Sequence, residues 1–164
     1  MKNNRNMKRR GFTLVELLIV IVVIGVLSAM MMLSSTEAVT SAKASNIVSN
    51  LRNLKTAALS LSIDSGDLIT SDTTETTLFN LTKKYLNGGT NIPDIGQYTI
   101  VLSKGSDPTA ASWFIKHTIT GTEDEKAQIK TKLKGRAKSV GLLATSSSTS
   151  AEYTDGNEVY VLVR

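Results

Sequence analysis

The longest apolar run of the chain covers residues 12–33, a stretch of 22 residues in which Glu16 is the single charged side chain. A helix of that length is roughly 33 Å long at about 1.5 Å per residue, which is enough to cross the hydrocarbon core of a bilayer. No proline interrupts the run, and Gly25 is its one candidate flexible point. The pattern predicts a membrane-spanning helix with a carboxylate near its start, where lipid makes a charge costly.

Polarity rises after residue 35, but the helical period continues. Apolar residues recur at alternating spacings of three and four, at Ala44, Ile47, Leu51, Leu54, Ala58 and Leu61. Such a narrow stripe is typical of a helix that packs on one side against the protein's own core. Because Ser65 and Gly66 offer a stop, we expect one helix over residues 12–63, about 78 Å long. We expect residues 12–35 to form its transmembrane part and residues 36–65 its amphipathic continuation.

The remaining residues, 66–164, predict a globular α+β head. A short helix is expected within residues 74–89, with its leucines directed inward and Gly88–Gly89 as its end. Three strands are expected at residues 96–105, 112–121 and 158–164, where apolar and polar side chains alternate, and residues 103–111 are expected to form the turn between the first two. We therefore expect a small antiparallel sheet that lies across the long helix.

A further helix is expected over residues 122–141. Thr122 and Glu125 have the spacing of a capping box, and Gly141 can close the helix. The following loop, residues 144–158, is rich in Ser and Thr and ends in a turn signal, Asp155–Gly156.

Basic side chains crowd this helix, and Lys130, Lys134 and Lys138 are spaced i, i+4 so that they form one stripe. A stripe of this kind is a candidate patch for DNA or another polyanion. The alternative is an ordinary solvated helix face. No aromatic side chain lies within the basic run to stack on bases, so the solvated face is the better interpretation.

The net charge of +5 belongs to the start of the chain. The first 11 residues contain no acid and five bases, namely Lys2, Arg5, Lys8, Arg9 and Arg10, whereas 14 bases and 14 acids balance from residue 12 onward. This distribution argues against a polyanion-binding function of the whole protein. A basic cluster directly before an apolar span also predicts a cytoplasmic N-terminus.

Few residues offer catalytic or metal-binding chemistry. The absence of cysteine removes disulfides, thiolate metal sites and cysteine nucleophiles. The single histidine, His117, lies in an expected strand, where a surface or hydrogen-bonded residue is more common than a catalyst. Asp155, Asn157 and Glu158 have oxygens that suit calcium, but they lack a calcium-loop pattern, so a turn is the better interpretation. We expect no enzymatic activity, no cofactor and no metal.

The N-terminal segment has three interpretations. The first is a secretory signal peptide that is cleaved after Ser28. However, the apolar run is longer than that of a typical signal peptide, and an acidic residue within it is unexpected. A plain membrane anchor leaves Glu16 without a role. The third interpretation is a family resemblance, because "RRGFTLVELLIVIVVIGVLSAM" (residues 9–30) closely resembles the N-terminal signature of type IV prepilins and the related pseudopilins of type II secretion and DNA-uptake systems.

This resemblance implies a pilin-like fold and a processing pathway. A membrane-embedded prepilin peptidase and methyltransferase would remove the leader, residues 1–11, by cutting between Gly11 and Phe12, and would then methylate the new amino terminus of Phe12. Glu16 would pair with the terminal amine of a neighbouring subunit during assembly. The partners would be the chain itself, the processing enzyme, an inner-membrane assembly platform and, before assembly, the lipid bilayer.

The implied function is that of a structural pilus subunit, a single-span precursor in the inner membrane that polymerises into an extracellular or periplasmic filament. The sequence departs from the pattern of many type IV pilins in one respect: it has no proline at residues 33–37, where they have one. A pseudopilin, or a minor pilin whose head binds DNA or a host ligand, therefore remains as an alternative. The task of the filament, whether adhesion, twitching motility, secretion or DNA uptake, is open.

Overall fold

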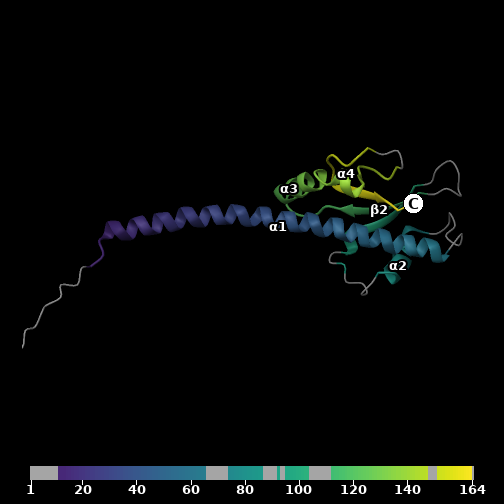
Figure 1. Cartoon of the computed structure of the whole chain (residues 1–164), viewed down its shortest axis with the longest axis horizontal. Coiled ribbons are helices and arrows are strands. Elements are labelled where there is room, and N and C mark those ends of the chain that lie inside the picture. The colour runs from purple at the N-terminus through teal and green to yellow at the C-terminus, as the bar shows by residue number, and fades with distance from the viewer. Residues whose placement is uncertain are drawn as a thin grey trace, which may run out of the picture. The chain divides into compact units, whose positions relative to one another are not determined.

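The computed structural model describes residues 11–65, 74–86, 92, 95–103, 112–147 and 151–163. The chain forms two compact units, Met1–Ala38 and Val39–Arg164, and helix α1 (Leu14–Ser65) contributes to both. The single long helix expected over residues 12–63 is thus confirmed, with both ends two residues later (Figure 1).

The part of α1 in the first unit exposes apolar side chains on every side. Exposed fractions of the large apolar side chains run from 51% at Val20 to 87% at Leu14, and Leu27 is 53% exposed. The helix passes through Gly25 without a break, and a Cβ atom there would meet nothing within 4 Å. By length and composition this helix can cross a membrane, because its most apolar window has a mean hydropathy of 2.8.

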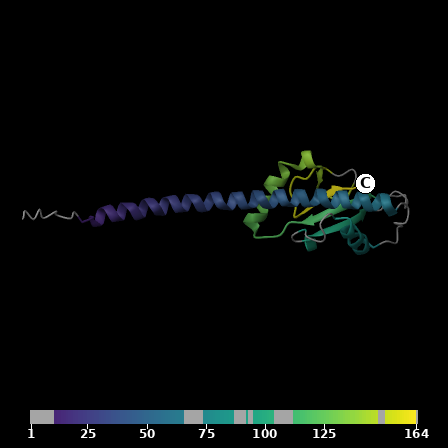
Figure 2. The ribbon, with the colours of Figure 1, turned by 60° about the horizontal axis from the view of Figure 1, so that its bottom comes forward.

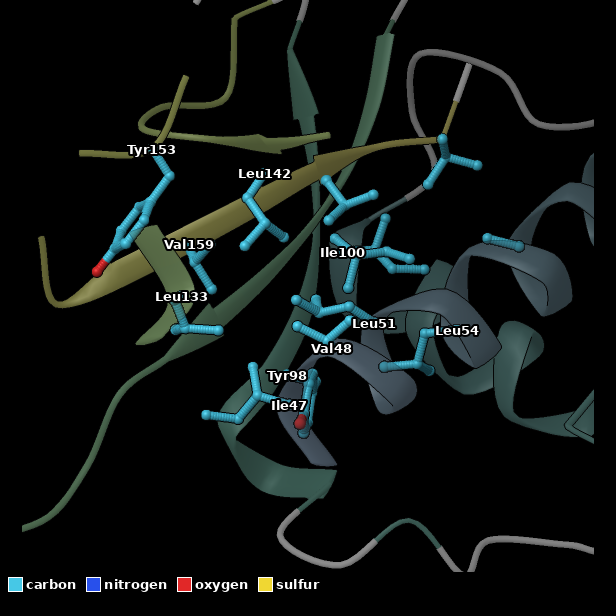
Figure 3. Packing of buried hydrophobic residues seen from close by; sticks show 14 of the residues in the cluster. Ile47, Val48, Leu51, Leu54, Tyr98, Ile100, Leu133, Leu142, Tyr153 and Val159 are labelled. Carbon is cyan, nitrogen blue, oxygen red and sulfur yellow. The ribbon is translucent and has the colours of Figure 1, made fainter. Parts of the chain in front are cut away.

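The part of α1 in the second unit buries one stripe. The expected stripe is confirmed, since Ala44, Leu51, Leu54 and Ala58 have no exposed surface and Ile47 and Leu61 have less than a tenth. Val48 and Leu51 point toward Ile100 of the sheet, while Val159 and Leu142 lie in the same layer (Figure 3). The core of the head therefore lies between this stripe and one face of the sheet (Figure 2).

The sheet has four antiparallel strands in the order β1-β2-β4-β3. Their bounds are β1 Tyr98–Ser103, β2 Ser112–Thr118, β3 Leu142–Leu143 and β4 Glu158–Leu162. The register pairs Ile100 with Ile115, Ile115 with Val161, and Val161 with Leu142. One row of apolar side chains thus crosses all four strands toward α1, as the alternation of residues requires.

The three expected strands are confirmed in shorter form, but β3 was not expected. It contains only two residues, too few to show an alternating pattern. A short 3-10 helix, Ile95–Gln97, replaces the start of the first expected strand. Most of the expected turn between β1 and β2, residues 104–111, lies outside the described residues.

Helix α2 (Glu75–Lys84) confirms the short helix expected within residues 74–89. Thr74 caps its start, and the hydroxyl of Thr74 accepts a hydrogen bond from the backbone N–H of Thr77. Leu78 is fully buried, and Leu81 and Leu86 pack against the core. The glycine pair expected to end the helix, residues 88–89, lies outside the described residues.

The prediction of one helix over residues 122–141 is wrong, because two helices occupy this range: α3 (Glu123–Lys134) and α4 (Ala137–Val140). The pattern of helical hydrogen bonds changes after Gly135, because the N–H of Arg136 donates to the backbone oxygen of Leu133, only three residues earlier. Glycine weakens a helix by about 1 kcal/mol relative to alanine. The capping box of Thr122 and Glu125 and the closing role of Gly141, which has φ 75°, are confirmed.

The described parts of the segment after β3, residues 144–147 and 151–157, contribute to the core. Tyr153 is 1% exposed, and its hydroxyl donates to the backbone oxygen of Gly156 at 2.7 Å. Burial, with the nearby charge of Asp155 as a second cause, raises the pKa of Tyr153 to about 12. This aromatic anchor was not expected, because it stands alone among polar residues.

Candidate processing and assembly site

The peptide bond between Gly11 and Phe12 lies just before α1. Residues 11–13 adopt no regular secondary structure, both residues of the bond are exposed, and Phe12 is 90% exposed. A Cβ atom on Gly11 would meet nothing within 4 Å. The fold itself therefore does not require glycine here, whereas a protease cleft that receives the backbone closely would.

Thr13 and Glu16 form a reciprocal cap at the start of α1. The carboxylate atom Oε2 of Glu16 accepts hydrogen bonds from the backbone N–H and from the hydroxyl of Thr13, each at 2.8 Å. In return, the hydroxyl oxygen of Thr13 accepts from the N–H of Glu16 at 3.2 Å. These bonds satisfy helix-terminal donors that would otherwise face hydrocarbon, so Glu16 has a local structural role.

This cap leaves part of the carboxylate available. Both bonds from Thr13 end on Oε2, and no described residue donates a hydrogen bond to Oε1. A carboxylate can accept several hydrogen bonds in different directions. Glu16 can therefore keep its cap and accept a further donor at Oε1.

The cap was readable from the sequence but was not predicted. Residues 13–16 read T-x-x-E directly before an apolar run, and the same spacing was used to predict the cap at Thr122 and Glu125. The pattern is hard to recognise because it lies at the start of an apolar run, where the main property of a charged side chain is its cost in lipid.

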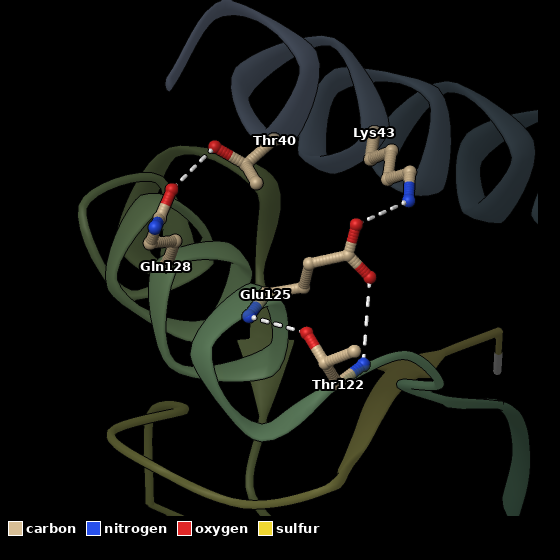
Figure 4. Close-up of polar contacts among 5 residues, drawn as sticks. All are labelled: Thr40, Lys43, Thr122, Glu125 and Gln128. Carbon is tan, nitrogen blue, oxygen red and sulfur yellow. Dashed lines mark hydrogen bonds and ion pairs between the residues drawn. The ribbon is translucent and has the colours of Figure 1, made fainter. Parts of the chain in front are cut away.

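In the head, polar contacts join α1 to α3 (Figure 4). The hydroxyl of Thr40 donates to Oε1 of Gln128 at 3.0 Å, and the ammonium of Lys43 lies 3.1 Å from Oε1 of Glu125. Lys43, together with the backbone N–H of Thr122, lowers the pKa of Glu125 below its ordinary value. Glu125 thus serves both the capping box of α3 and the junction with α1.

The three lysines of the candidate polyanion patch, Lys130, Lys134 and Lys138, do not form one uniform stripe. Lys130 lies 3.5 Å from Asp155, and Lys130 and Lys134 line a groove of about 320 Å³ together with Glu123 and Asp155. Lys138 is exposed on α4, beyond the break at Gly135. Two carboxylates in the groove weaken its attraction for a polyanion.

His117 is buried, so of the two settings considered for it, surface or hydrogen-bonded, the surface one is wrong. It is 2% exposed, and its ring lies 4.4 Å from the ring of Tyr98, centroid to centroid. Its Nδ1 atom makes no hydrogen bond to the described residues. The pocket beside it, about 150 Å³, has no carboxylate among its lining residues.

Of the three residues considered for calcium, Asp155, Asn157 and Glu158, the two carboxylates form ion pairs with lysines. Asp155 pairs with Lys130, and Glu158 pairs with Lys116 at 3.1 Å and accepts a hydrogen bond from Tyr160 at 2.6 Å. The bond from Tyr160, followed by the one from Lys116, lowers the pKa of Glu158. The described residues contain no cluster of three metal-binding side chains.

Residues 6–32 match the model of a family described as the prokaryotic N-terminal methylation motif. This motif is the signature of type IV prepilins and pseudopilins, which are structural precursors rather than an enzyme family, and it implies processing by a prepilin peptidase. Neither a curated protein nor a solved structure matches the chain. A long helix packed on a small antiparallel four-stranded sheet is consistent with the pilin fold, and the apolar helix with the motif fits a membrane-anchored precursor.

Proposed function

We propose that this chain is a structural subunit of a bacterial type IV pilus. It is made as a prepilin, cut after Gly11, methylated on the amine of Phe12, and polymerised through the apolar part of α1. In this proposal residues 1–11 are the leader, residues 12–35 the membrane and assembly segment, and residues 36–65 the continuation that supports the head, residues 66–164.

The observation that carries the proposal is a methylation motif on a helix that is apolar all round. The motif covers residues 6–32, and each large apolar side chain described from Phe12 to Met32 is at least half exposed. Exposed apolar surface of this extent requires lipid or other protein. Before assembly the lipid of the membrane can cover this apolar surface, and in a filament the neighbouring helices can cover it.

Glu16 gives the assembled state its register in this proposal. Cleavage creates a positive amine on Phe12, and the Oε1 atom of a neighbouring Glu16 is available to accept it. A charged group at the centre of a membrane helix costs about 2.5–3.5 kcal/mol on insertion scales. An ion pair in that medium demands good geometry, so it selects one arrangement of subunits more than it adds stability.

The N-terminus of the mature protein tests the processing step. Mass spectrometry of subunits isolated from the cell that makes them should show a chain that begins at Phe12 and carries one methyl group. A mature chain that begins at Ala29 would instead identify an ordinary signal peptide and refute the proposal.

Two substitutions of Glu16 separate its cap from its charge. Glutamine retains an oxygen that can accept from Thr13 and so preserves the capping box, whereas alanine removes both functions. We expect Glu16→Gln and Glu16→Ala to be inserted and processed, and both to assemble at least ~10-fold fewer filaments, because each lacks the charge. Wild-type filament yield from Glu16→Gln would contradict the pairing with the amine and leave only the cap.

A pseudopilin is the second candidate, favoured by the unbroken helix. Helix α1 continues from Leu14 to Ser65 with no proline, unlike many type IV pilins. The amount of protein separates the two functions: a major pilin should dominate filaments sheared from the cell surface, and a pseudopilin or minor pilin should not.

A further inference from the structure

Opposite charges are separated along the head. Residues 64–75 contain four acids and no base, and residues 126–138 contain six bases and no acid. The chain from residue 12 onward is neutral, with 14 bases and 14 acids. The mature protein is therefore uncharged as a whole but has two charged regions of opposite sign.

The basic region is represented by Lys134 and Lys138, which we call the basic pair. Both side chains are exposed, and neither forms an ion pair with an acid in the described part of the chain. Between them, Arg136 donates from Nη1 to the hydroxyl of Ser45 in α1 at 2.8 Å. This bond fixes the basic pair beside the first turns of α1 in the head.

The acidic region is represented by Asp64 and Glu75, which we call the acidic pair; the acids between them lie outside the described residues. Both are exposed and form no ion pair with a described base. Glu75 accepts a hydrogen bond from the N–H of Leu102 at 3.2 Å. Asp64, as acceptor for the hydroxyl of Tyr85, raises the pKa of that hydroxyl.

The two pairs are offset along α1. Asp64 follows Ser45 by 19 residues of the same helix, which is about 28 Å at 1.5 Å per residue. The bases nearest the acidic pair in sequence are Lys55 of α1 and Lys83 and Lys84 at the end of α2, and Lys83 lies over the ring of Phe79 at 4.8 Å. The offset is too long for the two pairs to neutralise each other within one subunit, because it exceeds the Debye length of ~8 Å at physiological salt.

We propose that the basic pair of one subunit contacts the acidic pair of another subunit displaced along the filament axis, so that the head supplies a head-to-tail contact. This inference rests on the proposed filament function and names the surfaces that meet. Two different complementary patches on one chain form a heterologous interface, and such an interface continues from subunit to subunit instead of closing as a dimer.

A second copy of the chain fits these surfaces better than a polyanion or a lipid surface does. A polyanion binder would gain from a net positive head, but this head carries an acidic region of comparable charge. Carboxylates also line the groove beside Lys134. Since an exposed ion pair contributes little binding free energy, the contact selects the arrangement of subunits, while the apolar helix supplies most of the binding.

Charge reversal with rescue tests the contact. We expect Lys134→Glu with Lys138→Glu, and separately Asp64→Lys with Glu75→Lys, each to lower the yield of sheared filaments at least ~10-fold, because like charges then face each other. The variant with all four substitutions should recover most of the yield. The proposal is overturned if either double variant assembles as the wild type does, or if the fourfold variant assembles no better than the doubles.

A second measurement uses unsubstituted filaments and so does not depend on the folding of variants. Filaments are assembled from a mixture of two isotopically labelled populations and treated with a carbodiimide, which links a lysine amine directly to a carboxylate. Links between the basic pair and the acidic pair should join peptides from different subunits. Filaments that give lysine–carboxylate links elsewhere but none between these regions overturn the proposal.

The outcomes also separate this inference from its premise and from other ligands. If the wild-type chain forms no filaments, the proposed function fails. If filaments form but lysine reversal abolishes only their retention of duplex DNA, or only their binding to phosphatidylglycerol vesicles, the basic pair serves that ligand and the subunit contact is refuted.

Discussion

The two parts of α1 are equally helical but differ in the pattern of their apolar residues. Before Ala38 apolar side chains cover every side, and Leu27 is 53% exposed; after Val39 they follow one stripe, and Leu51 has no exposed surface. The sheet of the chain itself buries the stripe, whereas no described residue buries the apolar surface of the first part. Apolar content thus indicates that a helix needs burial, and its periodicity indicates whether that burial is internal.

The largest expected effect comes from matched leucine substitutions in the two parts. Leu51→Ala should destabilise the head by about 2–5 kcal/mol, because it leaves a cavity in a packed core. Leu27→Ala should leave the unfolding of the head unchanged, since Leu27 belongs to the other unit. Urea unfolding of full-length protein in detergent, followed by the fluorescence of Trp113, measures both. Equal effects of the two substitutions would contradict the distinction between the parts.

The features of the fold that follow from local pattern could be predicted from sequence. The stripe of α1, the three longer strands and the cap at Thr122 each depend on residues close together in the chain. The break at Gly135 was missed, because a glycine inside a helical pattern is often tolerated and tertiary context decides the outcome. Strand β3 was missed because two residues carry no period.

The features that depend on distant residues could not be predicted. The bond from Thr40 to Gln128 joins residues 88 positions apart, and no local pattern marks either of them. The sequence left open whether His117 lies at the surface or is hydrogen-bonded inside, whereas the register places it opposite Tyr98 on the face that packs against α1. In the candidate site, Gly11, Phe12 and Glu16 came from a resemblance, whereas the role of Thr13 could have been read from the local T-x-x-E spacing but was not predicted.

A smaller effect should come from the point where the head first binds α1. Thr40 is 2% exposed and donates to Gln128, so Thr40→Val, which keeps the shape and removes the donor, should cost about 0.5–1.5 kcal/mol. The control is Thr56→Val, because Thr56 is exposed and its hydroxyl donates to the oxygen of Arg52 within the same helix. Urea unfolding of the full-length variants, as above, measures both effects. If the two variants lose equal stability, the bond from Thr40 to Gln128 does not help hold α3 against α1.

The smallest expected effect depends on pH and concerns the charge that joins α1 to α3. The bond from Lys43 lowers the pKa of Glu125 from its ordinary value of 4.5. The ionised form therefore stabilises the folded state fully above that value, and the contribution is lost as the pH falls toward the lowered pKa. Glu125→Gln keeps the capping box, because glutamine can replace glutamate there, but removes the charge.

The variant should therefore lose less stability than the wild type when the pH is lowered from about 7 to about 3, and should differ from it mainly near pH 7. The matched control is Asp124→Asn, since Asp124 is exposed in the same turn and pairs with no base among the described residues. Unfolding midpoints of full-length protein across this pH range provide the measurement. Parallel pH profiles for the wild type and Glu125→Gln would show that Lys43 does not stabilise the head through this carboxylate, leaving neutral contacts such as Thr40–Gln128 to hold α3 against α1.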